Sequence, residues 1–158
     1  MATTPTIAWI AYAPVKSMAL VALEAADLGP SGIAGDRRFV VLDGAGRLCN
    51  GVRFGRLATI VPRVSADGGT LELRFPDGTI AAGPVRRTEP VTVRFYGDDR
   101  RLHGLDGPWD AALTAWAGMP LRLVEADGEG TAIDRMPKGG AVTIVAARDL
   151  AELALAGG

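Results

Sequence analysis

Short runs of alternating apolar and polar residues, separated by turn sequences, are the feature that most limits how this chain can fold. In "TLELRF" the apolar residues Leu71, Leu73 and Phe75 alternate with polar ones, so an extended chain places them on one face. "VTVRFY" at 91–96 repeats the pattern, and "DGAG", "ADGG", "PDG" and "YGDD" supply turns. Further strand-like runs are "TIAWIAYA", "MALVALEAADL", "RRFVVLD", "LATIVPRVS", "PLRLVEA" and "AVTIVAA". This spacing predicts a mainly β protein, a barrel or a sandwich.

Two stretches have the period of a helix instead. Between Pro108 and Gly118 apolar residues recur at helical spacing and form one stripe: Trp109, Ala112, Leu113 and Trp116. Asp106 and Gly107 precede this stretch as a cap, and Gly118 ends it. The tail "ARDLAELALAGG" predicts a second helix. We therefore expect a β-barrel with one or two short helices.

Size, charge and cysteine content exclude several classes of protein. The chain has 158 residues, the length of one domain, and a net charge of −1, which gives no broad nucleic-acid-binding surface. The single cysteine, Cys49, excludes an intrachain disulfide and a Cys-rich zinc site, and we expect a cytoplasmic protein. The apolar start "TIAWIAYAPV" has no basic leader and stops at Lys16, too short to span a bilayer. We interpret it as a buried strand and expect no membrane partner.

Several phrases of the sequence occur in the order of a known family. They are "PVKSM", "GDRRFVVLDGAGRLCNG" with "RLATIVP", "VTVRFYGD", "WDAALTAWAGMPLRLVEA" and "DRMPKGGAVTIVAARDLAEL". Together they resemble the N-terminal β-barrel domain of MOSC proteins, followed by the start of the MOSC core. The resemblance implies a barrel domain over residues 1–126, and a loop with the first strand and helix of a core over 127–158.

The resemblance also implies a cofactor and the residues that hold it. The family is associated with molybdenum cofactor, in sulfur-carrier domains of cofactor sulfurases and in reductases of N-hydroxylated compounds. In relatives the matching positions, here Lys16, Ser17 and Arg37, help to hold the phosphate and pterin of molybdopterin. Asn50 stands where relatives often have threonine, and it is a candidate to face the same pocket. A lysine, a forked guanidinium and a hydroxyl are suitable donors for an oxyanion.

The expected metal ligand is the main departure from that family. In relatives the cysteine that binds molybdenum lies downstream of the segment that here ends at "ARDLAEL". Cys49 falls in "GRLCNG", at a position that the family does not use for metal. Without a thiolate the metal has no evident ligand, so we expect no metal site and no molybdenum reductase activity from this chain alone. Another chain would then supply the metal chemistry, or it is absent.

Each candidate residue also has a simpler interpretation. Lys16 and Ser17 would suit a solvated strand end, Arg37 a local pair with Asp36, and Asn50 a turn. His103, the one histidine, is the side chain that changes charge most readily near neutral pH, but alone it is a poor metal site. The sequence shows no Walker loop, GxSxG elbow, HExxH motif or dinucleotide fingerprint.

Three hypotheses of function remain open at this point. The first is a pocket for an anionic cofactor or small metabolite, held by the basic and hydroxyl residues. The second is a small barrel enzyme of a biosynthetic pathway, of the cyclase or isomerase type, because barrel interiors can hold an apolar cavity. The third is an interaction module in which a strand such as "AVTIVAA" pairs with a partner, or with a second copy to give a homo-oligomer.

Overall fold

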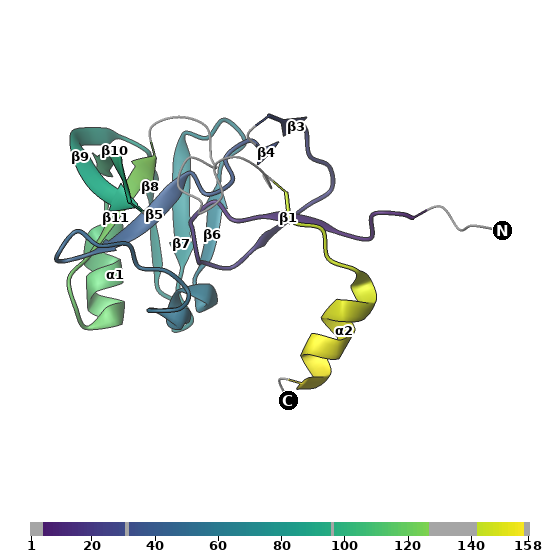
Figure 1. The fold of residues 1–158 in the computed structure, drawn as a ribbon. Coiled ribbons are helices and arrows are strands. Elements are labelled where there is room, and N and C mark those ends of the chain that lie inside the picture. Colours follow the sequence, from purple (N-terminus) through teal and green to yellow (C-terminus); the bar gives the residue numbers. More distant parts are fainter. Residues whose placement is uncertain (1–4, 31, 96, 127–141, 157–158) are drawn as a thin grey trace.

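The computed structural model describes residues 5–30, 32–95, 97–126 and 142–156, and Figure 1 shows their arrangement. The larger sheet has four antiparallel strands in the order β5 (Phe39–Asp43), β11 (Leu121–Ala126), β10 (Asp98–Leu105) and β9 (Arg87–Phe95). The second has the antiparallel strands β6 (Val61–Val64), β7 (Thr70–Arg74) and β8 (Ile80–Pro84). Two short ribbons pair β1 (Ile10–Tyr12) with β2 (Val21–Leu23), and β3 (Leu28–Gly29) with β4 (Gly32–Ile33). The prediction of a mainly β fold with two short helices is confirmed, although the described strands form separate sheets and not one closed ladder.

The main core lies between the two larger sheets. Phe39, Val41 and Leu123 of the four-stranded sheet pack in one buried cluster with Leu71 and Leu73 of β7. The predicted alternation along β7 is therefore the real burial pattern of that strand. Burial of side chains of this size contributes about 1.5–3 kcal/mol each. The cluster thus joins the two larger sheets.

The four-stranded sheet is buried on its other face as well. A second cluster contains Val40 and Leu42 of β5 with Val124, Leu102 and Val93 of the neighbouring strands. All five residues of β5 are buried, which fits the continuous apolar run "FVVL" at its centre, where apolar and polar residues do not alternate. β5 is an edge strand of the four-stranded sheet, and the candidate site lies along its free side.

Helix α1 (Trp109–Ala117) packs against β11, as Figure 1 shows. Its first residue, Trp109, is buried and donates its indole N–H to the carbonyl of Leu71 at 3.2 Å. The predicted end is confirmed, because Gly118 adopts a left-handed φ of 70° and closes the last turn. The predicted cap is wrong, because the N-cap residue is Pro108, which makes no side-chain hydrogen bond. Asp106 instead donates its backbone N–H to the carbonyl of Arg86.

Two apolar segments differ from their predicted environment. The start of the chain is not a buried strand, because Ile7 and Trp9 are 80% and 60% exposed and β1 begins only at Ile10. The expected strand "AVTIVAA" is not formed by the described residues 142–146, where Ile144 is 93% exposed. An isolated extended segment has no neighbouring strand to bond with, so hydrophobicity alone does not make it a strand.

The helix predicted for the tail is present as α2 (Ala147–Ala156). Residues 127–141, where the sequence suggested a domain boundary, lie outside the described residues, so the division at 126 stays a prediction. No helix in the described part of the chain is long and apolar enough to cross a membrane.

A candidate anion-binding corner beside β5

The edge of β5 that faces away from β11 brings two distant segments together. Val15 pairs in parallel with Phe39, and the N–H of Lys16 donates to the carbonyl of Phe39 at 2.8 Å. The N–H of Arg37 donates in turn to the carbonyl of Ala13 at 2.6 Å. The chain around Lys16 therefore lies directly beside the chain around Arg37. We call the surroundings of Lys16, Ser17 and Arg37 the corner.

The backbone of the corner is strained at two of the residues that the sequence singled out. Ser17 has a φ of 69° and Arg37 a φ of 53°, and in the described part of the chain no other residue except glycine has a positive φ. Ser17 lies in a tight turn that the N–H of Met18 closes on the carbonyl of Val15 at 3.2 Å. A side chain in this conformation costs roughly 1–2 kcal/mol. Strain of this kind collects at binding sites, where the rest of the structure holds it in place.

Lys16 is not a solvated strand end. The residue is only 9% exposed, although lysine is among the residues least often buried. Removing an ammonium group from water is unfavourable unless negative or polar groups surround it. The Lys16 residue is thus largely removed from bulk solvent.

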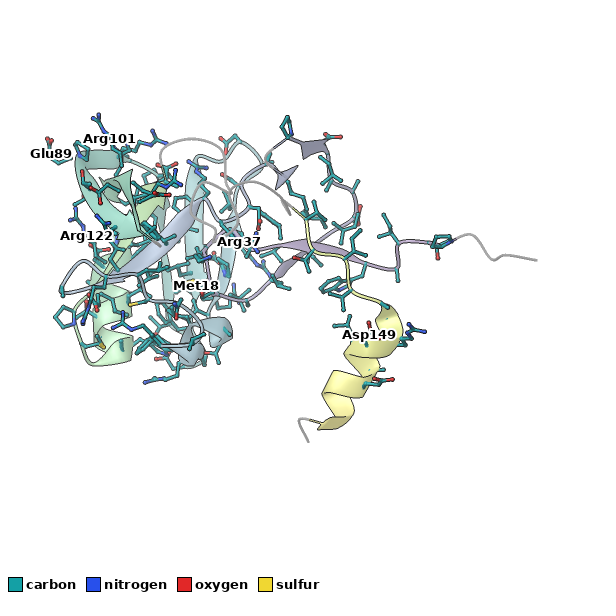
Figure 2. All side chains as sticks on the ribbon, viewed as in Figure 1. Met18, Arg37, Glu89, Arg101, Arg122 and Asp149 are labelled. Carbon is teal, nitrogen blue, oxygen red and sulfur yellow. The ribbon has the colours of Figure 1, made fainter. Side chains whose placement is uncertain are left out.

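Arg37 is oriented by its neighbour Asp36, as the simpler interpretation predicted. The guanidinium pairs with one oxygen of the buried Asp36 carboxylate. The other oxygen accepts the N–H of Ala13 at 2.8 Å. Burial, and then the charge of Asp36, raise the pKa of Tyr12, which keeps that phenol protonated. Figure 2 shows Arg37 beside β1, where this ribbon meets the larger sheets.

Ser17 and Asn50 join a third segment to the corner. The hydroxyl of Ser17 accepts the N–H of Gly51 at 3.1 Å and keeps its own hydrogen to donate. The side-chain oxygen of Asn50 accepts the N–H of Val52 at 3.1 Å and of Arg53 at 2.9 Å. Asn50 therefore has the turn role that was its simpler interpretation. In this structure its side-chain oxygen fixes the loop that follows.

Cys49, the one cysteine of the sequence, belongs to the core and not to the donor set of the corner. Cys49 is buried in the main core, and burial is the largest of the effects that raise the pKa of its thiol. Within the described ranges no three His, Cys, Asp or Glu side chains are grouped as metal ligands. His103 lies on β10, between Pro90 of β9 and Glu125 of β11, and so belongs to a different part of the sheet.

Sequence reasoning missed a second charged cluster, formed around Glu125. This carboxylate is 2% exposed and accepts hydrogen bonds from Arg38 Nε at 2.6 Å and Arg87 Nε at 2.7 Å. Burial would raise the pKa of Glu125, but the bonds from Arg87 and Arg38 outweigh it and lower the pKa. Arg38 also donates to the carbonyl of Gly68 at 2.7 Å, which ties the β6–β7 turn to the larger sheet. The available signal was a glutamate inside the apolar run "PLRLVEA".

Comparison with known proteins identifies the class to which this fold and corner belong. The sequence pattern of the MOSC N-terminal beta barrel domain matches residues 4–116. The chain therefore belongs to the MOSC N-terminal β-barrel family, and all four candidate residues lie inside the matched region.

A solved structure supports the fold. It is the solution structure of a protein from Bordetella bronchiseptica, with 19% sequence identity and a TM-score of 0.51. The similarity covers 81% of this chain and 95% of that one. No curated protein matches the chain.

Proposed function

We propose that the corner binds the phosphate group of an anionic cofactor or small metabolite, with Lys16, Ser17 and Arg37 as its donors. The observation that carries the proposal is the coincidence of two independent features. The residues chosen from family resemblance adjoin one another, and two of them hold the strained backbone positions. A buried lysine beside them adds positive charge that is poorly screened by water.

Each group has a separate part in the proposed binding. Lys16 supplies a compact positive charge, and Arg37 a planar guanidinium already oriented by Asp36. Ser17 supplies a neutral O–H donor, while its oxygen holds Gly51. Charge-assisted hydrogen bonds of this type are the stronger ones in proteins. A ligand that enters finds donors held in place before it binds.

The family context makes molybdopterin the first cofactor to test. Its phosphate fits the donor set of Lys16, Ser17 and Arg37, and the bound cofactor would supply redox or sulfur-transfer chemistry. The proposal assigns only the phosphate end to this chain, because the buried thiol of Cys49 faces the core. A cytoplasmic location remains part of the proposal.

The interaction-module hypothesis is favoured by a different observation. Large apolar side chains are exposed at the start of the chain and near its end: Ile7, Trp9, Leu20, Ile144 and Val145. Sedimentation of the purified protein over a range of concentrations tests this hypothesis. A concentration-dependent dimer supports it, and a monomer at all concentrations contradicts pairing with a second copy.

Titration calorimetry with inorganic phosphate and with molybdopterin tests the proposed corner. We expect Lys16→Met to weaken phosphate binding by about 1.5–3 kcal/mol, because a charged hydrogen bond is lost while the buried volume is kept. Arg74→Gln is the matched control, since it removes one positive charge from an exposed position of β7. Equal affinities in Lys16→Met and Arg74→Gln, or no binding by the natural protein, would overturn the proposal.

A further inference from the structure

The loop fixed by Ser17 and Asn50 carries an arginine that the corner does not yet use. Arg53 is the fourth residue of the turn that begins at Asn50, and its N–H donates to the Asn50 side-chain oxygen. The N–H of Phe54 donates back to the carbonyl of Asn50 at 2.8 Å, which closes the turn. Gly51 in the same turn donates its N–H to the hydroxyl of Ser17, so the backbone of Arg53 lies near the corner.

The guanidinium of Arg53 is only weakly held where it lies. It is 3.7 Å from the nearer oxygen of Asp43, beyond hydrogen-bond distance, and the side chain is 50% exposed. Asp43 already accepts the N–H of Ala45, the N–H of Arg47 and the Nε–H of Arg47, each at 2.9 Å. An exposed ion pair of this geometry contributes little to stability. A change of side-chain rotamer therefore releases Arg53 at little cost.

We propose that Arg53 is the third cation of the corner and moves from Asp43 onto the bound anion, which selects a dianionic phosphate monoester over a monoanion. This inference rests on the proposed function of the corner. Arg53 adds a further positive charge to those of Lys16 and Arg37, and added positive charge favours a dianion over a monoanion. Asp43 keeps Arg47 as its partner when Arg53 leaves.

In this arrangement Ser17 and Asn50 act partly as positioning residues. Ser17 holds Gly51, and Asn50 holds the amide of Arg53, so both fix the place from which the arginine reaches the ligand. Asn50 thus contributes to binding indirectly, because it holds the backbone of the loop in place. The same turn explains why a polar residue with a short side chain is needed at position 50.

The test compares methyl phosphate with dimethyl phosphate by titration calorimetry between pH 5 and 8. The monoester gains its second charge near pH 6, whereas the diester stays a monoanion throughout. We expect the natural protein to bind methyl phosphate more tightly as the pH rises. Arg53→Gln should bind it about tenfold more weakly at pH 8, and lose most of the pH dependence, because a charged hydrogen bond is removed. Binding of dimethyl phosphate should be the same in both proteins.

Two control variants separate this inference from the proposed function. Arg74→Gln has the same net charge as Arg53→Gln and should bind as the natural protein does. If Arg53→Gln behaves like Arg74→Gln while Lys16→Met loses binding, the corner binds anions but Arg53 is not part of it. If neither ester binds to the natural protein, both proposals fail. Thermal unfolding of each variant shows that the fold is intact, which an exposed arginine predicts.

Discussion

The corner and the Glu125 cluster are built from the same kinds of residue but in opposite ways. In the cluster, Arg38 and Arg87 each donate to a different oxygen of one buried carboxylate. In the corner, Asp36 uses one oxygen for a backbone N–H and the other for Arg37. Both places pair a buried carboxylate with arginine, so formal charge alone does not distinguish a structural ion pair from a binding site.

The backbone distinguishes them. Glu125 lies on β11 and Arg87 at the start of β9, and these two strands flank β10 in one sheet. Ser17 and Arg37 lie in turns with left-handed φ values, which the neighbouring strands must hold in place. This difference in the backbone is why we propose the corner, and not the cluster, as the binding site.

The largest effect is expected from breaking the cluster. Glu125→Gln should lower the free energy of unfolding by about 2–3 kcal/mol, because two arginines lose their carboxylate partner. The value is below that of a fully buried pair, since the Arg87 side chain is 45% exposed. Urea denaturation followed by tryptophan fluorescence measures it. Glu72→Gln is the control, because Glu72 pairs with Arg74 at the surface and should change stability by less than about 0.5 kcal/mol. Equal effects would show that the cluster is no more structural than a surface pair.

Acid should weaken the Glu125 cluster. The pKa of Glu125 is lower in the folded protein than in the unfolded chain. Its contribution is therefore complete above the unfolded value, about 4.3, and is lost as the pH falls through the folded value. We expect stability to fall below about pH 4.5 in the natural protein and to fall less steeply in Glu125→Gln.

Three other carboxyls also have lowered pKa values: Asp43, Asp67 and Asp77. They too make the protein less stable in acid, and they do so equally in the natural protein and in Glu125→Gln. Denaturation midpoints from pH 2.5 to 7 therefore have to be compared between the natural protein and Glu125→Gln. Parallel curves for the two proteins would remove Glu125 from the acid response.

The sequence pattern correctly predicted those elements in which the spacing of apolar residues within one element shows which face is buried. The alternation of Leu71 and Leu73, and the helical stripe that includes Trp109, each describe one face of one element, and the structure has them. The environment of "TIAWIAYA" was predicted wrongly, because apolar composition does not say whether a partner strand covers Trp9. The Glu125 cluster was missed for the same reason, since it joins residues that are far apart in the sequence.

The candidate site could be predicted in part. Family resemblance supplied Lys16, Ser17, Arg37 and Asn50, and the strand pairing places their segments side by side. The burial of Lys16 and the left-handed turns depend on contacts between distant segments. No local pattern could give them, and whether these residues bind a ligand remains a prediction.

The smallest expected effect concerns the backbone strain at Ser17, which separates the corner from the cluster. At a φ of 69° a Cβ atom is unfavourable, so Ser17→Gly should be about 1 kcal/mol more stable than Ser17→Ala, although both lose the hydrogen bond to Gly51. Ser65 is the control, because it also accepts a backbone N–H but is not among the positive-φ residues. There glycine should be less stable than alanine, since it only adds freedom to the unfolded chain. Thermal unfolding of the four variants decides the sign. If alanine is the more stable at position 17 as well, the turn is relaxed in solution, and strain no longer separates the corner from the cluster.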